Sequence, residues 1–116
     1  MLIRVDPSAP EPMFEQVASA VRGGIARGDV AAGERLPGAR DLAESLGLNI
    51  HTVLRGYQVL RDEGLIELRR GRGAVVTAEA VAGQAALMDA ITAVHEAARR
   101  LALTADELVA IVRKGY

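Results

Sequence analysis

Two short helical segments joined by a glycine turn constrain the fold of this chain more than any other feature. The first segment covers residues 39–46 and is followed by Gly47, which favours the left-handed backbone that ends a helix. Asn49 is a favourable N-cap for the second segment, expected over residues 50–63 and ended by Gly64. Two helices separated by a turn of this length predict a helix-turn-helix.

Two short strands with an arginine-rich tip are expected directly after the helix pair. Aliphatic residues at 65–68 and 74–77 predict the strands, and the Arg/Gly run at 69–73 predicts the tip of a hairpin. Before the pair, apolar residues recur at spacings of three and four between residues 11 and 27, which predicts a helix. A very short strand is expected within residues 31–38. The pattern indicates a mainly α winged helix-turn-helix with a small β-hairpin wing.

The C-terminal part of the chain has a different pattern. Residues 80–101 are alanine-rich and contain no proline, and their apolar positions alternate at spacings of four and three, as in a heptad seam. Thr104 and Glu107 match a capping box, so a second helix is expected to begin there. We therefore expect a DNA-binding winged-helix domain over residues 1–78 and a two-helix dimerisation tail over residues 79–116. The expected dimerisation residues are Leu87, Ile91, Val94, Ala98, Leu101, Leu108, Ile111 and Val112.

The apolar seam of the tail has two interpretations. It can pack onto the second tail helix within one subunit, or it can pack against the tail of a second copy. Two short helices enclose too little volume to bury both apolar faces, so pairing between subunits is the favoured interpretation.

Composition and charge exclude several classes of function. The chain has no cysteine, which excludes disulfides and Cys-ligated metal sites, and its two histidines are far apart in the sequence. No nucleophile–base arrangement is evident, so we expect no catalytic residues, no metal and no cofactor. The N-terminus lacks a signal peptide pattern and no apolar stretch approaches about 20 residues, so a cytoplasmic protein without membrane contact is expected. The net charge of −1 means that any nucleic-acid binding depends on a local basic patch.

Such a patch is expected at the second helix of the helix-turn-helix and at the hairpin. If Val53, Tyr57 and Leu60 face the core, the polar side chains of that helix lie on the exposed side, where a recognition helix meets base edges. Exposed Leu54 can offer only an apolar contact, for instance to a thymine methyl group. Arginines on a glycine-rich hairpin suit phosphates or a minor groove. The expected DNA-binding residues are Arg40, Asn49, His51, Thr52, Arg55, Gln58, Arg69, Arg70, Arg72 and Gly73.

Several of these residues also have structural interpretations. Hairpin arginines are often a solvated turn, and Arg40 and Arg55 can form surface ion pairs with neighbouring carboxylates. Thr52 can bond the backbone at the helix start instead of contacting DNA. Tyr57 is expected in the core rather than stacked on a base, and His95 is interpreted as a structural or surface histidine rather than a ligand.

Several spaced motifs point to one family. They are Pro-Met-Phe-Glu-Gln-Val at 12–17, Leu-Pro-Gly-Ala-Arg-Asp-Leu-Ala at 36–43, Leu-Gly-Leu-Asn at 46–49, Thr-Val at 52–53, Tyr57, Leu60, Gly-Leu-Ile at 64–66 and Gly-Arg-Gly at 71–73. In this order and register, from about Pro12 to Val76, the sequence resembles the winged-helix domain of GntR-family transcriptional regulators. The short helical tail is similar to that of the YtrA-like subfamily. The resemblance implies that the tail mediates dimerisation and that the protein controls nearby transporter or membrane-protein operons.

The sequence departs from the family pattern at positions that bear on DNA reading. Gly38 stands where the family usually has Ser or Ala, and Ile50 and Leu54 stand where several relatives carry basic or polar residues. The operator of a relative therefore does not transfer to this chain. Base contacts are expected to rest on His51 and Arg55.

The leading hypothesis is a homodimeric repressor that binds double-stranded DNA. Its two recognition helices would read half-sites of an inverted repeat about one helical turn apart, and bound protein would occlude the polymerase. The alternative is a winged-helix protein-interaction module that does not bind DNA, which the net acidity and the exposed Leu54 favour. Any small-molecule effector would need a pocket made by the dimer interface, because the tail alone has little room for one of about 300 Å³.

Overall fold

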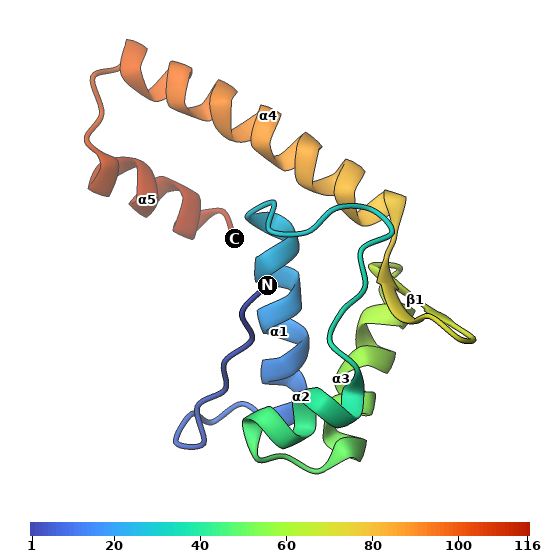
Figure 1. The fold of residues 1–116 in the computed structure, drawn as a ribbon. Coiled ribbons are helices and arrows are strands. Elements are labelled where there is room, and N and C mark those ends of the chain that lie inside the picture. The colour runs from blue at the N-terminus through green and yellow to red at the C-terminus, as the bar shows by residue number, and fades with distance from the viewer. The chain divides into compact units, whose positions relative to one another are not determined.

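The computed structural model describes residues 1–116 as five α-helices and one β-hairpin (Figure 1). The elements are α1 (Met13–Ala26), α2 (Ala39–Leu46), α3 (Ile50–Asp62), β1 (Ile66–Arg69), β2 (Gly73–Val76), α4 (Ala78–Arg100) and α5 (Ala105–Lys114). The chain divides into two compact units, Met1–Gln84 and Ala85–Tyr116, with α4 beginning in the first. The mainly helical class with a hairpin wing, predicted from the sequence, is confirmed.

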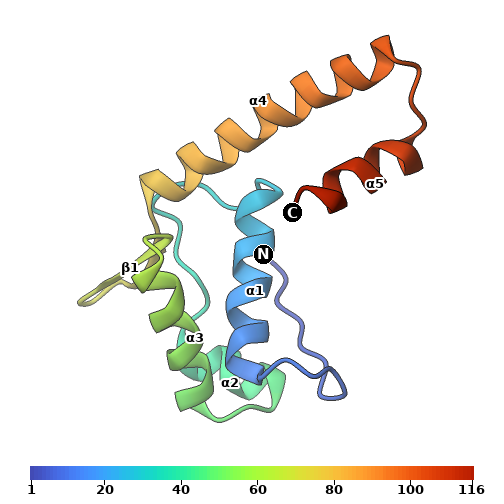
Figure 2. The same cartoon turned by 180° about the vertical axis from the view of Figure 1, so that it is seen from behind.

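The core of the first unit forms where α1 packs along α3, and the two helices lie side by side in both views (Figures 1 and 2). Val17 and Val21 of α1 and Val53 and Leu60 of α3 are fully buried. These residues recur at spacings of four and seven, so each set lies on one face of its helix. Burying one such side chain stabilises the fold by about 1.5–3 kcal/mol, so this contact contributes substantially to stability.

Gly56 allows α1 and α3 to approach closely at the centre of this contact. A methyl group in place of its hydrogen would lie 2.9 Å from the carbonyl oxygen of Phe14 and 3.1 Å from Cγ1 of Val17. No side chain fits such a gap without moving the backbone of α1. The crossing point of the two helices is therefore set by a glycine.

Glycines also end α2 and α3 as the sequence predicts. Gly47 has φ 69° and Gly64 has φ 80°, which is the left-handed region that glycine adopts at no steric cost. After α3, the Leu65 N–H donates to the Leu60 carbonyl at 3.0 Å, and the Leu65 side chain packs against the core. This reversal leads the chain directly from α3 into β1.

The hairpin pairs β1 with β2 one residue away from the predicted positions. The ladder runs from Ile66 opposite Val76 to Arg69 opposite Gly73. The expectation that Arg69 and Gly73 belong to the tip is therefore wrong, because both are ladder residues. The Arg72 N–H donates to the Arg69 carbonyl at 3.1 Å. The hairpin tip is therefore a tight turn formed by the three residues between the strands.

The short strand expected within residues 31–38 is present as a single β-bridge. Arg35 pairs with Val75 of β2, and the Leu36 N–H donates to the Ala74 carbonyl at 2.9 Å. The connection between α1 and α2 therefore runs along the free edge of β2. This pairing brings Arg35 beside the hairpin.

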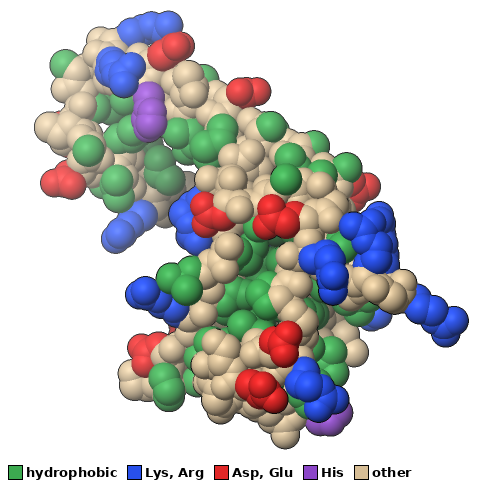
Figure 3. All heavy atoms as spheres, viewed as in Figure 1, with side chains coloured by type: hydrophobic (Ala, Val, Ile, Leu, Met, Phe, Trp, Pro, Cys, Tyr) green, Lys and Arg blue, Asp and Glu red, His purple; other side chains and the backbone are tan.

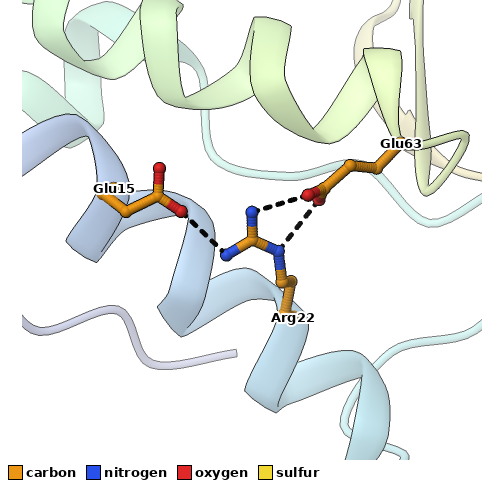
Figure 4. Close-up of polar contacts among 3 residues, drawn as sticks. All are labelled: Glu15, Arg22 and Glu63. Atoms are coloured by element: carbon orange, nitrogen blue, oxygen red, sulfur yellow. Dashed lines mark hydrogen bonds and ion pairs between the residues drawn. The ribbon is translucent and has the colours of Figure 1, made fainter.

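An ion-pair network connects α1 to the end of α3 (Figure 4). The Arg22 guanidinium donates to both carboxylate oxygens of Glu63, at 2.9 and 2.7 Å, and to Glu15 at 3.1 Å. The hydrogen bond to Glu63 is the largest of the effects that raise the pKa of Arg22. A bidentate pair of this kind fixes the orientation of the two helices as well as their separation.

In the second unit, the last turns of α4 are followed by a tight reversal and α5. Ala102 has φ 54° at the reversal, and the Leu103 N–H donates to the Ala98 carbonyl at 3.1 Å. The predicted capping box is confirmed, with Glu107 N–H donating to the Thr104 hydroxyl at 3.1 Å and the Thr104 N–H donating to the Glu107 carboxylate at 2.9 Å. These bonds lower the pKa of Glu107. None of the helices is both long and apolar enough to cross a membrane.

The close approach at Gly56 gives a test of the core. Replacing Gly56 by Ala should lower the free energy of unfolding by about 1–3 kcal/mol, because the added methyl group forces α1 away from α3. Urea denaturation followed by circular dichroism measures the change. The matched control is Gly83→Ala in α4, where nothing lies within 4 Å of the added methyl group. This control should gain up to about 1 kcal/mol from helix propensity, and an equal gain in both variants would contradict the packing described.

Candidate functional site

The exposed side of α3 carries the polar residues that the sequence analysis assigned to it. Val53 and Tyr57 are buried, whereas His51, Arg55 and Gln58 are exposed, which confirms the predicted orientation of the helix.

Asn49 caps α3 as predicted. Its side-chain oxygen accepts a 2.8 Å hydrogen bond from the His51 N–H. The cap uses only the oxygen of the amide, and its NH₂ group is left without a protein partner. A donor therefore stands beside the first turn of the helix.

Arg55 stacks on Phe14. Its Cζ lies 3.8 Å from the centroid of the Phe14 ring, a cation–π geometry. Phe14 and Arg55 line an open hollow of about 320 Å³ together with Met13, His51 and Thr52. Three of the predicted DNA-binding residues are thus brought together at the N-terminal half of α3, beside the start of α1.

A second hollow, of about 380 Å³, lies between α3, the hairpin and the start of α2. Four arginines line it, namely Arg35, Arg69, Arg70 and Arg72. Figure 3 shows basic side chains on the hairpin that projects from this unit. The floor includes Leu54, Tyr57 and Leu68, of which Leu54 and Leu68 are exposed. The arrangement combines a concentration of positive charge with an apolar surface made by α3 and β1.

The arginines of this second hollow are not equally available. Arg69 is paired with Glu67, two residues earlier on the same strand, at 2.8 Å. Arg35, Arg70 and Arg72 form no ion pair, and neither does Arg40. The unpaired positive charge of the hairpin is therefore concentrated at its tip.

Sequence reasoning missed Arg35 and Phe14. Arg35 joins the hairpin cluster through its β-bridge to Val75, and Phe14 reaches the α3 surface through the crossing of α1 and α3. Arg40, Asn49 and Gln58 line neither hollow. Arg40 is exposed in the first turn of α2. The sequence alone does not define how far it lies from the other predicted DNA contacts.

Tyr57 holds the segment that carries Arg35 in place. It is buried among the core residues, as expected, and its hydroxyl donates to the Pro37 carbonyl at 2.7 Å. Burial raises the pKa of the Tyr57 hydroxyl, so the group stays protonated and remains a donor. The bond fixes the entry to α2 relative to α3.

In the second unit, most residues of the predicted dimerisation seam are exposed in the single chain. The exposed members are Leu87, Ile91, Val94, Leu101, Ile111 and Val112, with Met88 and Val109 beside them. Leu108 is partly buried, and Ala98 is 8% exposed. The Ala98 carbonyl also accepts hydrogen bonds from the N–H groups of Leu101 and Leu103 in the turn after α4. An apolar surface of this extent on a small unit is unusual unless another surface covers it.

The structure contains no group of three or more His, Cys, Asp or Glu side chains placed to hold a metal ion. His95 lines an open hollow of the tail unit beside Arg99 and Leu103.

A sequence model of the family "Bacterial regulatory proteins, gntR family" matches residues 14–76. The chain is 34% identical over 79 residues to the transcriptional repressor YtrA of Bacillus subtilis. This match covers 68% of the chain and 61% of the repressor, so more than a third of the relative lies outside it.

Two solved structures are similar to this chain, one over a larger part of it than the Bacillus subtilis relative and one over a smaller part. YtrA from Sulfolobus acidocaldarius, a GntR-family transcription factor, is 32% identical with a TM-score of 0.64, covering 79% of this chain and 97% of that one. The AraR DNA-binding domain in complex with operator ORX1 has a TM-score of 0.57 at 23% identity, covering 63% of this chain and 90% of that one. The AraR likeness shows the fold alone.

The Tyr57 hydroxyl gives a test of how the second hollow is built. Tyr57→Phe keeps the ring in the core but leaves the Pro37 carbonyl without its donor, so the free energy of unfolding should fall by about 1–2 kcal/mol. Urea denaturation measures this change, and amide hydrogen exchange should show faster opening around residues 35–39. Val59→Ala, on the same helix, is the control for a general loss of stability. Unchanged exchange at residues 35–39 in Tyr57→Phe would contradict the positioning role.

Proposed function

Because the chain belongs to the gntR family of bacterial regulatory proteins, we propose that it is a DNA-binding repressor that acts as a homodimer on an inverted-repeat operator. The observation that carries this proposal is the exposed polar side of α3, flanked by a hairpin with unpaired arginines. Residues 1–78 are assigned to DNA binding and residues 79–116 to dimerisation.

In the proposed complex, α3 lies in the major groove, whose width admits one α-helix. His51 and Arg55 face the base edges, and Asn49, Thr52 and Gln58 contact bases or the adjoining backbone. Leu54 offers an apolar surface suited to the methyl group of thymine. The contacts to DNA bases are thereby confined to the first turns of α3, a helix that is packed against the core.

The hairpin and α2 supply contacts to the DNA backbone. Arg70 and Arg72 carry unpaired charge at the hairpin tip, Arg35 stands beside them, and Arg40 approaches a phosphate from the first turn of α2. Such contacts neutralise phosphates and release counterions, which makes the affinity depend on salt. They hold the protein in register while α3 reads the sequence.

The relatives support the same function. The name of the Bacillus subtilis relative is that of a transcriptional repressor, and the Sulfolobus acidocaldarius structure is described as a GntR-family transcription factor. Repression by occlusion of the polymerase follows from binding alone and needs no further activity. No catalytic role is proposed for any residue.

Dimerisation through the tail is supported by its uncovered apolar surface. Leu87, Ile91 and Val94 are exposed on α4, and Ile111 and Val112 on α5. Because two identical tails present the same surface, a two-fold contact covers both at once and places two α3 helices on one duplex. An inverted repeat is the operator symmetry that such a dimer reads.

A protein-interaction module without DNA binding is the second candidate. The net charge of −1 and the apolar floor made by Leu54 and Leu68 favour it. The two candidates differ in what the arginines do. They are essential for binding DNA but dispensable for an apolar protein contact.

Replacing Arg69, Arg70 and Arg72 together by Ala separates these candidates. Fluorescence anisotropy with labelled duplexes from the chain's own genome should show steep salt dependence for the wild type. In the variant, the log–log slope should fall by about one for each phosphate that is no longer neutralised. The control replaces Arg4 and Arg27, which line neither hollow. A wild-type affinity that is flat with salt, or an unchanged slope in the triple variant, would exclude the proposed binding mode.

Ile91→Glu tests the tail. A carboxylate at the centre of the proposed contact should convert the dimer to a monomer, because two buried charges would face each other without partners. Sedimentation velocity measures the mass, and operator affinity should fall together with it. Ala93→Glu adds the same charge on α4 away from the seam and should remain dimeric. If Ile91→Glu sediments like the wild type, the dimer does not form through this surface.

A further inference from the structure

Phe14 is the only phenylalanine of the chain, and the core does not use it. It is partly buried at the start of α1 and lies outside the cluster of apolar side chains that α1 and α3 bury. Phenylalanine side chains usually serve cores, where each buries about 150–250 Å². Here the Arg55 guanidinium instead stacks on one face of the ring, with its Cζ 3.8 Å from the ring centroid.

The backbone holds the two residues of this stack together. Gly56 follows Arg55 on α3, and it is the residue whose missing side chain brings α3 against the carbonyl oxygen of Phe14. The separation of Phe14 and Arg55 is therefore set by the close contact of α1 and α3 at Gly56. A stack anchored in this way restrains a long side chain that otherwise samples many rotamers.

The stacked guanidinium keeps its hydrogen-bonding edge free. Arg55 is exposed and forms no ion pair, and none of its N–H groups has a protein acceptor. Stacking uses the face of the planar group, which leaves its N–H donors pointing outward in the plane. His51 and Thr52 line the same hollow, so the free edge lies among the residues proposed to face the bases.

We propose that Phe14 is a positioning residue that holds Arg55 ready to read one guanine in each half-site of the operator. A planar pair of N–H donors matches O6 and N7 of guanine in the major groove. Because the ring fixes the plane of the guanidinium before binding, less rotamer freedom is lost when the complex forms. The inference rests on the proposed function. It adds that the base recognised by Arg55 is guanine and that Phe14 makes this recognition selective.

Selection of bound sequences from a random duplex library tests this inference. The wild type should return a two-fold symmetric consensus with a G·C pair at one position of each half-site. Phe14→Leu, which keeps an apolar side chain but removes the aromatic face, should lower the preference at that position by about 10-fold and keep the others. Phe14→Tyr keeps the face and should keep the preference. The salt slope should stay the same in both variants, because the same phosphates are neutralised.

A double-mutant cycle with Arg55→Ala separates positioning from a general structural effect. If Phe14 acts through Arg55, adding Phe14→Leu to Arg55→Ala should change operator affinity by less than about 2-fold. Arg55→Lys keeps the charge but not the planar fork, and it should lower the same G·C preference that Phe14→Leu lowers. Thermal denaturation shows whether Phe14→Leu folds, and Phe14→Met, which also lacks an aromatic face, provides the same test if it does not.

The outcomes distinguish this inference from the function on which it rests. A wild-type protein that selects no sequence would overturn both. A wild-type consensus that is unchanged in a folded Phe14→Leu variant would overturn the positioning role, whatever the result for Arg55→Lys, and would leave the proposed function standing. An equal fall in affinity from Phe14→Leu with and without Arg55 would also overturn it.

Discussion

The close packing of α1 on α3 at Gly56 is the contact on which the rest of the molecule depends. It buries Val17 and Val53 in the core, and it fixes the direction in which α3 presents its opposite side. The Arg22 network fixes the far end of the same helix pair. The precision of a surface on a helix depends on the packing behind it, and here that packing leaves no room for a methyl group at Gly56.

Local concentration of charge gives a chain of net charge −1 a surface suited to a polyanion. The clustered arginines come from two segments that meet only in the fold, which are the β-bridge residue Arg35 and the hairpin. Glu67 offsets one of these charges by pairing with Arg69. Because screening limits such charges to a range of about 10 Å at 0.1 M salt, their placement beside α3 counts for more than the total charge.

The parts of the fold and site that depend on neighbours in sequence could be predicted, and those that depend on distant contacts could not. The Asn49 cap, the turn at Gly64 and the buried stripe of α3 follow from local backbone preferences and helical spacing. The strand bounds of the hairpin differ by one residue from the prediction, because cross-strand hydrogen bonds determine them. Arg35 and Phe14 gave no local signal, since a β-bridge and a helix crossing bring them to the site.

Hydroxyl-radical footprinting on a selected duplex tests the central claim most directly. A dimer with one α3 in each of two successive major grooves should protect two backbone tracts related by two-fold symmetry, about one helical turn apart on one face of the DNA. Flanking protection should disappear when the tip arginines are removed. A single unsymmetrical tract, or no protection at an ionic strength where the protein is folded and dimeric, would contradict the account.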